Sequence, residues 1–198
     1  MKRYPIIILI GLLFLCFGFS PHERVIARKK AGAACNTVIN QTTQNDSMSL
    51  GSDPNGYNQW GAQVFTSDGI YTAKTFYVML AVNRTGDMAG QTVTASLCTT
   101  SAGHATETCT NADETLDATT LTTTPTAYKF NIAAGYSLTA ADFAVRLYQS
   151  KGDYGDYVLF YYYGTGSKNM DYDDTPPDSW TTKDSTATAY IVVKDCVE

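Results

Sequence analysis

The chain has 198 residues, and its 14 Lys and Arg stand against 19 Asp and Glu, for a net charge of −5. Six of the basic residues precede residue 35, so residues 35–198 hold 8 Lys and Arg against 18 Asp and Glu, a net charge of −10. This acidity argues against a nucleic-acid partner, which requires a basic stripe, and against an anionic membrane surface. It is compatible with neutral glycans, with Ca²⁺ or with no small partner at all.

Residues 1–34 have the pattern of a secretory signal. Lys2 and Arg3 precede an apolar run over residues 6–19, and small residues follow at 31–34. The apolar run is shorter than the roughly 20 residues of a membrane-spanning helix. We therefore expect a signal peptide and processed N-terminal segment at 1–34, and one secreted or cell-surface domain at 35–198. A signal anchor and a lipid anchor at Cys35 are the minor alternatives.

The composition of the remaining 164 residues favours strands. They contain 28 threonines between Thr37 and Thr188, and the chain has 14 tyrosines; both residue types suit a half-buried pleated surface. Glutamate occurs after residue 34 only as Glu107, Glu114 and Glu198. This shortage of helix-forming residues argues against an α-rich fold.

In chain order, the polar stretch up to residue 58 is expected to hold short strands at 35–39 and 47–50, with a turn at 53–56. Alternating apolar side chains then predict strands at 60–66, 74–82, 91–98, 127–132 and 142–149. A continuous apolar and aromatic run predicts a further strand at 156–163, and the last strand is expected at 188–194. The stretches 99–117 and 168–183 are expected to be long polar loops.

Eight or nine short strands without a convincing helix indicate an all-β fold. We expect a single-domain, two-sheet antiparallel β-sandwich, with jelly-roll connectivity as the preferred version.

Four cysteines follow the signal, and they allow three pairings. Cys98 ends a predicted strand, and Cys109 lies in the loop that a bond between them would staple. Cys35 and Cys196 lie at opposite ends of the domain, where a bond would join its first and last strands. We predict the disulfides Cys98–Cys109 and Cys35–Cys196, because neither a C-x-x-C spacing nor a second histidine supports a metal site.

The chain shows no recognisable catalytic constellation. His104 is the one histidine after residue 34, and no serine or cysteine nucleophile motif accompanies it. Gly164-Thr165-Gly166-Ser167 is not a nucleophile elbow. A glycosidase with two carboxylates stays open as a third option, because aspartates are abundant, but no pair stands out. We expect a protein that is not an enzyme and has no catalytic residues.

An acidic cluster is the one candidate metal site. Asp171, Asp173 and Asp174 surround Tyr172 and could supply oxygen ligands to a structural Ca²⁺. The cluster lacks the glycine and the terminal glutamate of an EF-hand loop, and Ca²⁺ requires six or more converging oxygens. A solvated acidic loop is therefore the simpler interpretation, and no other cofactor is expected.

Aromatic residues crowd the region 154–180, and Tyr57 and Trp60 precede it. Sugar rings stack their C–H faces on flat aromatic side chains, while nearby polar groups bond the hydroxyls. The tyrosines at 161–163 fit a core strand somewhat better, whereas Trp180 lies in a polar stretch where a core role is harder to explain. The predicted ligand-binding residues are Tyr154, Tyr157, Tyr172, Asp173 and Trp180.

The order of the strands also resembles a known family. Gln63-Val64-Phe65-Thr66 leads into the strand at 74–82 and then into Thr92-Val93-Thr94-Ala95-Ser96-Leu97. The stretches 128–132, 136–140, 143–148 and 157–163 follow. Over roughly residues 60–194, this order resembles the choice-of-anchor jelly-roll domains of bacterial surface proteins and, more distantly, carbohydrate-binding modules. The resemblance implies an extracellular and generally non-catalytic domain, and it brings no functional residues to carry over.

Together these features predict a secreted or cell-surface adhesion module that binds a glycan or another surface ligand through an aromatic, Asp-rich loop face. The alternative is a structural, appendage or surface-layer subunit. In that case the polar segment 36–58 pairs with a neighbour's sheet edge and forms a homo-oligomer. A polysaccharide hydrolase comes third. Nucleic acid and, beyond the signal, membrane are not expected as partners.

Overall fold

The computed structural model describes residues 34–52, 58–83, 88–150, 156–173 and 180–198. The signal peptide predicted for residues 1–34 therefore lies outside the described residues, apart from Ala34. The described residues form twelve strands and one short 3₁₀ helix, η1 (Ala118–Thr120). The strands are β1 (Thr37–Gln41), β2 (Asp46–Ser52), β3 (Asn58–Thr66), β4 (Tyr71–Val82), β5 (Thr92–Ser101), β6 (His104–Asn111), β7 (Leu116–Asp117), β8 (Thr126–Leu138), β9 (Asp142–Gln149), β10 (Val158–Asp173), β11 (Thr181–Ala189) and β12 (Ile191–Lys194).

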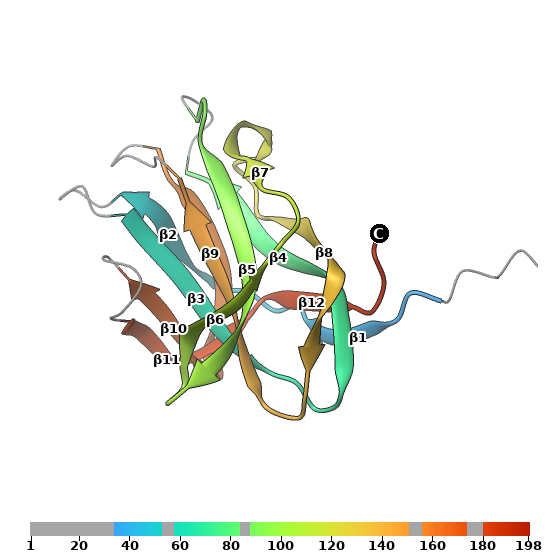
Figure 1. Ribbon diagram of the computed structural model, residues 1–198. Helices are drawn as coiled ribbons and strands as arrows, with labels where there is room; N and C mark the ends of the chain where they lie inside the picture. The colour runs from blue at the N-terminus through green and yellow to red at the C-terminus, as the bar shows by residue number, and fades with distance from the viewer. Residues whose placement is uncertain (1–33, 53–57, 84–87, 151–155, 174–179) are drawn as a thin grey trace, which may run out of the picture. The chain divides into compact units, whose positions relative to one another are not determined.

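Two antiparallel sheets pack against each other, which confirms the predicted all-β sandwich (Figure 1). In the first sheet, β4 pairs with β8 along one edge and with β12 and then β10 along the other. β1 extends this sheet beyond β12, and β2 extends it beyond β10. In the second sheet the strands run in the order β11, β10, β3, β9, β5 and β6. The jelly-roll connectivity is not confirmed by this order and stays a prediction.

The long strand β10 belongs to both sheets. Its first residues, from Val158, pair with β2 and β4. Its last residues, Met170 to Asp173, pair with β3 and β11. The register against β11 shifts between Tyr163 and Lys168, where the strand passes from one sheet to the other. β10 therefore ties the two layers together through backbone hydrogen bonds.

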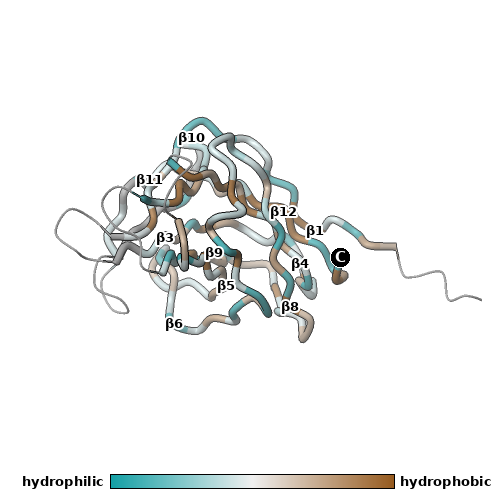
Figure 2. Tube along the Cα trace, turned by 90° about the horizontal axis from the view of Figure 1, so that it is seen from above, coloured by the Kyte–Doolittle hydropathy of each residue, from teal (hydrophilic) through white to brown (hydrophobic). Residues whose placement is uncertain are grey.

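Alternating side chains from both sheets fill the space between them. Phe76 on β4 stacks on Phe130 of β8, with 5.5 Å between ring centroids, and Phe65 on β3 contacts Phe143 of β9 at 6.3 Å. The largest buried side chains also include Tyr162, Phe160, Leu80, Leu97 and Leu147. Brown, hydrophobic stretches run through the middle of the domain in Figure 2. Burial of these apolar surfaces from water is the main force that holds the sheets together.

The prediction of a loop over residues 99–117 is wrong. The end of β5 together with β6 and β7 occupies most of this stretch; β6 pairs with β5, and β7 pairs with the start of β5. Threonine favours strands, but β6 lies at the end of the sheet, where both of its faces carry polar residues and the apolar alternation is absent. Thr106 bonds Thr99 across the pair at 2.6 Å between hydroxyl oxygens. His104 consequently begins a strand and does not lie in a loop.

The prediction of a loop over residues 168–183 is also wrong for most of its length. β10 continues to Asp173, and β11 begins at Thr181, with residues 174–179 between them outside the described part. The strand predicted at 188–194 is divided into the end of β11 and β12 by Tyr190. Twelve strands therefore replace the eight or nine expected. In both segments, pairing with neighbouring strands stabilises polar, Thr-rich sequence that lacks an alternating pattern.

Both predicted disulfides are present. Cys98 and Cys109 are directly paired residues of β5 and β6. Cys35 and Cys196 bond across the ends of the domain, with 5.3 Å between their Cα atoms. β1 and β12 are neighbouring antiparallel strands, as the prediction required.

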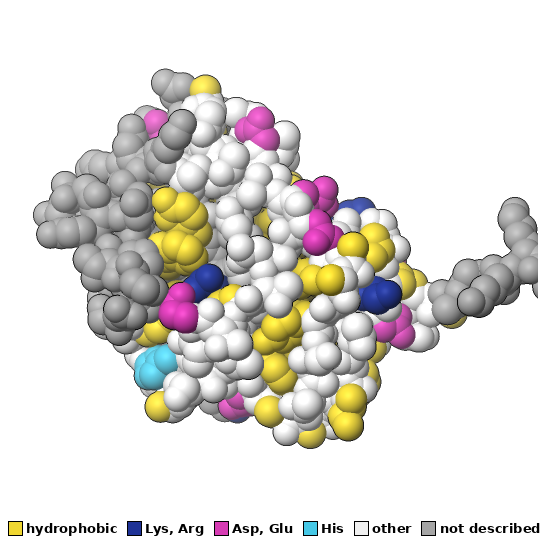
Figure 3. Space-filling view, in the orientation of Figure 1, with side chains coloured by type: hydrophobic (Ala, Val, Ile, Leu, Met, Phe, Trp, Pro, Cys, Tyr) yellow, Lys and Arg dark blue, Asp and Glu magenta, His cyan; other side chains and the backbone are white. Residues whose placement is uncertain are grey.

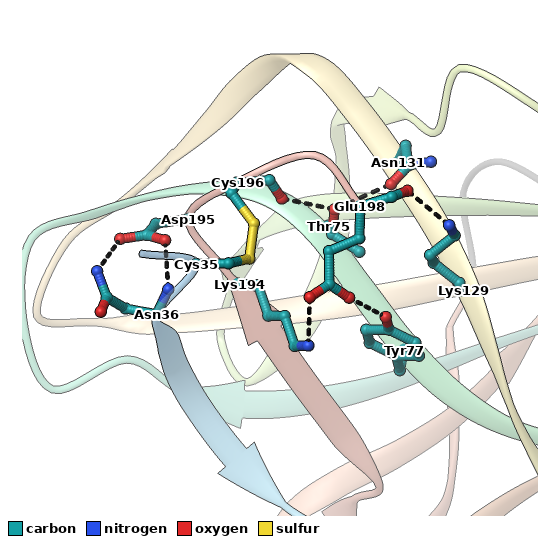
Figure 4. Close-up of a disulfide and its surroundings, with 10 residues drawn as sticks. All are labelled: Cys35, Asn36, Thr75, Tyr77, Lys129, Asn131, Lys194, Asp195, Cys196 and Glu198. Atoms are coloured by element: carbon teal, nitrogen blue, oxygen red, sulfur yellow. Dashed lines mark hydrogen bonds and ion pairs between the residues drawn. A yellow bond between two sulfur atoms is a disulfide. The ribbon is translucent and has the colours of Figure 1, made fainter. Parts of the chain in front are cut away.

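Hydrogen bonds surround the Cys35–Cys196 disulfide (Figure 4). The backbone N–H of Asn36 donates to Asp195 Oδ1 at 2.8 Å, and its side-chain amide donates to Asp195 Oδ2 at 2.9 Å. These bonds hold the pKa of Asp195 below its usual value. The hydroxyl of Thr75 on β4 donates to the carbonyl of Cys196 at 2.6 Å. The first and last strands are thus joined to each other and to the centre of the first sheet.

Glu198 adds a second set of contacts beside this disulfide. Lys194 donates to its carboxylate at 2.6 Å, and the hydroxyl of Tyr77 donates to the same carboxylate. The ammonium of Lys129 donates to the backbone carbonyl of Glu198 at 2.5 Å (Figure 4). The bond to Glu198, followed by burial and the negative charge of the carboxylate, raises the pKa of Tyr77 to about 12. Lys194 and then Tyr77 lower the pKa of Glu198.

Candidate functional site

The outer face of the second sheet carries the most informative arrangement of side chains. Along β3 and β9, successive side chains point to opposite faces of the sheet. Phe65 on β3 and Val145 and Leu147 on β9 point inward to the core between the sheets. Trp60 on β3 and Arg146 and Tyr148 on β9 occupy the alternate positions, so they point outward. The strand register brings these three side chains together.

Trp60 and Tyr148 are directly paired across β3 and β9, and their rings stack with centroids 4.5 Å apart and planes 25° apart. The guanidinium carbon of Arg146 lies over the ring of Trp60 at 4.7 Å from its centroid. Arg146 Nη1 also donates to the carboxylate of Glu107 on β6 at 3.1 Å. We call Trp60, Tyr148, Arg146 and Glu107 the aromatic platform. In Figure 3, hydrophobic side chains gather beside a basic and an acidic group on the face where β5, β6 and β9 lie in front.

The two charged members of the aromatic platform differ in exposure. Only 11% of the Arg146 side chain is exposed, against 50% of Glu107. An ion pair with one exposed partner contributes little to stability, because water screens it. A cation over the face of a tryptophan adds a modest attraction. These contacts hold the guanidinium over the ring of Trp60, and the carboxylate of Glu107 beside it stays accessible.

A cluster of small side chains continues the same face next to the aromatic platform. Its members are Ala62 and Val64 on β3, Ala144 on β9, Cys98 on β5 and Ala105 on β6. Trp180, which immediately precedes β11, is half-buried and packs against this cluster. Two buried N–H groups on this face, Arg146 Nε and Trp180 Nε1, have no hydrogen-bond partner among the described residues. A buried donor without an acceptor costs free energy, and an oxygen acceptor bonded to either N–H group would lower this cost.

An ion pair lies on the same face at the far end of β3 and β9. Lys168 on β10 donates to Asp142 on β9 at 2.7 Å and 2.9 Å, and the hydroxyl of Thr66 on β3 donates to Asp142 at 2.7 Å. Partial burial acts to raise the pKa of Asp142, but the bonds from Lys168 and Thr66 outweigh it and lower the pKa. Because the two charged groups bond each other and Thr66, we assign the pair a structural role.

The predicted ligand-binding residues are distributed over two places. Trp180 lies on the outer face of the second sheet, as described above. Asp173 is paired with Trp60 in the β10–β3 register, and Tyr172 is paired with Gly61. Tyr157 instead precedes the first part of β10, where its backbone exchanges hydrogen bonds with Asn83. Tyr154 lies outside the described residues. The β10–β3 register thus places Asp173 beside Trp60, Trp180 packs against the neighbouring small-residue cluster, and Tyr157 lies elsewhere.

The predicted Ca²⁺ ligands occupy the end of β10. Asp171 is paired with Ala62 and Asp173 with Trp60, while Asp174 lies outside the described residues. Among the described residues, the one group with metal-ligand spacing consists of Cys35, Cys196 and Glu198. The two sulfurs of that group are bonded to each other, so it is not a metal site. Calcium binding at Asp171, Asp173 and Asp174 stays a prediction.

The polar segment proposed for strand addition is used within the domain. β1 pairs with β12, and β2 pairs with β10 and β3. One edge of β1 has no strand beside it among the described residues, and a groove of about 250 Å³ runs along Val38–Gln41, Thr66 and Asp68. Assembly through this segment stays a prediction.

Sequence reasoning did not assign Trp60, Tyr148, Arg146 and Glu107 to the site. The sequence did contain a signal for Arg146. The apolar alternation of β9 places Arg146 on the face opposite to that of the inward-facing Phe143, Val145 and Leu147. The same alternation places Tyr148 on the side of Arg146. The step that the sequence did not supply was the register that sets Trp60 opposite Tyr148.

No protein-family model matches the chain, and no match was found among the curated proteins or the solved structures. The described residues include no helix of the length and hydrophobicity required to span a membrane. The two disulfides are compatible with an extracellular protein.

Proposed function

We propose that this protein is a secreted or cell-surface, non-catalytic β-sandwich module that binds a glycan through the aromatic platform. The stack of Trp60 and Tyr148 beside Arg146 and Glu107 is the observation that carries the proposal. Flat aromatic rings accept the apolar C–H face of a sugar, and neighbouring charged groups bond its hydroxyls. The site that we propose therefore keeps Trp180 and Asp173 from the sequence prediction and adds the four platform residues.

The location of the aromatic platform supports recognition. It lies on the outer face of the second sheet, so a chain-like ligand need not pass between the two sheets to reach it. The side chains come from three strands whose backbones are fixed by the sheet, so their positions are set before a ligand arrives. Binding sites built in advance lose less conformational entropy when the ligand binds.

Replacing Trp60 with alanine tests the proposal. We expect Trp60→Ala to lower the affinity for a bound polysaccharide by at least about tenfold, because the stacking surface is lost. The measurement is affinity electrophoresis of residues 35–198 through gels that contain single polysaccharides, with titration calorimetry on each hit. Unchanged circular dichroism and melting temperature would show that the fold is intact.

Trp180→Ala serves as a second variant, because Trp180 packs against the neighbouring small-residue cluster. Tyr77→Phe serves as the matched control, because Tyr77 lies on the first sheet beside Glu198 and far from β3 in the strand order. Normal polysaccharide binding by both Trp60→Ala and Trp180→Ala would refute the site.

A further inference from the structure

We propose that the ligand of the aromatic platform is a neutral sugar with adjacent hydroxyl groups, and that the site discriminates against acidic and amino sugars; this inference rests on the glycan-binding function proposed above. The argument comes from the pairing of Glu107 with Arg146 at 3.1 Å beside the stacked rings of Trp60 and Tyr148.

The two charged groups of the aromatic platform are of opposite kinds and lie side by side. The ionised carboxylate of Glu107 only accepts hydrogen bonds, and the guanidinium of Arg146 only donates them. A sugar hydroxyl does both, so one hydroxyl can donate to Glu107 while its neighbour accepts from Arg146. No single charged group on a sugar satisfies both partners. The carboxylate of a uronic acid can bond Arg146 alone, and the ammonium of an amino sugar can bond Glu107 alone.

Electrostatics point the same way. A carboxylate that reached Arg146 would lie next to the carboxylate of Glu107, which is the more exposed of the two charged groups. Like charges at this distance repel, and the net charge of −10 over residues 35–198 adds to the repulsion of an anionic polymer. An ammonium group would meet Arg146, which is already held by Glu107 and by the ring of Trp60. A neutral sugar incurs neither repulsion.

The unpartnered donors on this face agree with a hydroxyl-bearing ligand. Arg146 Nε and Trp180 Nε1 both lack an acceptor among the described residues. Sugar hydroxyl and ring oxygens are acceptors, and a small outward shift of either side chain on ligand binding would bring these N–H groups into use. The neutral sugar therefore supplies acceptors to Arg146 and Trp180 and donors to Glu107.

The test compares neutral, acidic and amino polymers grouped by parent sugar. The gluco series is cellohexaose, oxidised cellulose with carboxylate at C6, and chitosan; the galacto series is galactan, polygalacturonate and polygalactosamine; the manno series is mannan and polymannuronate. We expect residues 35–198 to bind the neutral member of one series at least about tenfold more tightly than its charged counterparts, at 20 mM and at 150 mM salt. Tighter binding of an acidic or amino member would overturn the inference and leave the glycan-binding proposal standing. If no member of any series binds, both the glycan-binding proposal and the inferred preference for neutral sugars are refuted.

Glu107→Gln provides the decisive variant. Glutamine keeps an acceptor and adds donors but removes the negative charge. Compared with the natural protein, we expect the variant to bind the neutral polymer about tenfold more weakly and the acidic polymer of the same series more tightly. The ratio of the affinities for the neutral and the acidic polymer should therefore fall. Asp142→Asn is the matched control, since it removes one carboxylate from an ion pair on the same sheet face outside the aromatic platform. An equal change of preference in both variants would show that net charge alone sets the selectivity, and it would overturn the role of Glu107.

Discussion

Gly61 determines how closely the second sheet approaches the core beneath the aromatic platform. A Cβ at this position would collide with the side chains of Met48 and Leu50 on β2. The two residues on either side of Gly61 are Trp60 and Ala62, whose side chains point to the opposite, outer face. The absence of a side chain at residue 61 thus allows the strand that carries Trp60 to lie against the first sheet.

Gly61→Ala is therefore expected to destabilise the domain by about 1–3 kcal/mol, the usual cost of inserting a methyl group into a packed core. Urea unfolding followed by circular dichroism measures the change. Gly164→Ala is the matched control, because a Cβ there would make only ordinary contacts with Asn45, Asp46 and Asp184. Equal stability of Gly61→Ala and the natural protein would show that Met48 and Leu50 move aside without cost.

At the residue scale, the sequence identified only part of the candidate face. Trp180 stood out because a tryptophan in a polar stretch is unusual, and it does lie on the candidate face. Tyr157 and the tyrosines of β10 stood out for their number, but Tyr162 is buried in the core and bonds Asp46 at 3.2 Å. Clustering along the chain does not reveal proximity in a sandwich, because neighbours across strands are distant in sequence.

At the scale of elements, strands with an apolar face were predicted well. β9 was predicted with its observed bounds, and β5 nearly so, because apolar side chains that face the core recur at every second position of both strands. β6 and β11 were missed because strand pairing, which a sequence does not display, stabilises their polar residues. Because the sequence does not show which strands pair, it also did not predict the contact between Glu107 of β6 and Arg146 of β9.

The two disulfides join pairs of elements at very different separations, 161 residues for Cys35–Cys196 and 11 for Cys98–Cys109. A disulfide stabilises chiefly by restricting the unfolded chain, and the effect grows with the length of the closed loop. We expect Cys35→Ser with Cys196→Ser to lower the free energy of unfolding by about 5 kcal/mol, and Cys98→Ser with Cys109→Ser by about 3 kcal/mol. Urea unfolding of both double variants without reductant measures these values. A larger loss from the Cys98–Cys109 pair would contradict the expected order.

At the scale of the whole molecule, we expect the buried Tyr162 to make the stability of the domain depend on alkaline pH. Burial raises the pKa of Tyr162, and the charges of Asp46 and Asp184 and the bond to Asp46 raise it further. In the folded state Tyr162 therefore stays neutral at a pH where the same residue in the unfolded chain, with a pKa near 10, has ionised. Its contribution to stability is complete below about pH 10 and is lost as the pH rises toward its higher pKa in the folded state.

We thus expect the free energy of unfolding to fall steeply above about pH 10, with Tyr77, whose pKa is raised to about 12, contributing in the same direction. In Tyr162→Phe the decline between pH 9 and pH 11.5 should be shallower than in the natural protein. Urea unfolding at half-unit pH steps measures both curves, and Tyr128→Phe is the control. An identical slope in Tyr162→Phe and the natural protein would exclude Tyr162 as a source of the decline.

The bond between Cys35 and Cys196 also determines how the domain responds to mechanical force. Any chain attached before Cys35 and after Cys196 pulls on two residues whose Cα atoms are 5.3 Å apart and covalently connected. Tension between such attachments passes through the disulfide, and the strands from β1 to β12 carry almost none of it. While this bond is oxidised, the sandwich and its outer face keep their shape under load, and the domain acts as an inextensible link.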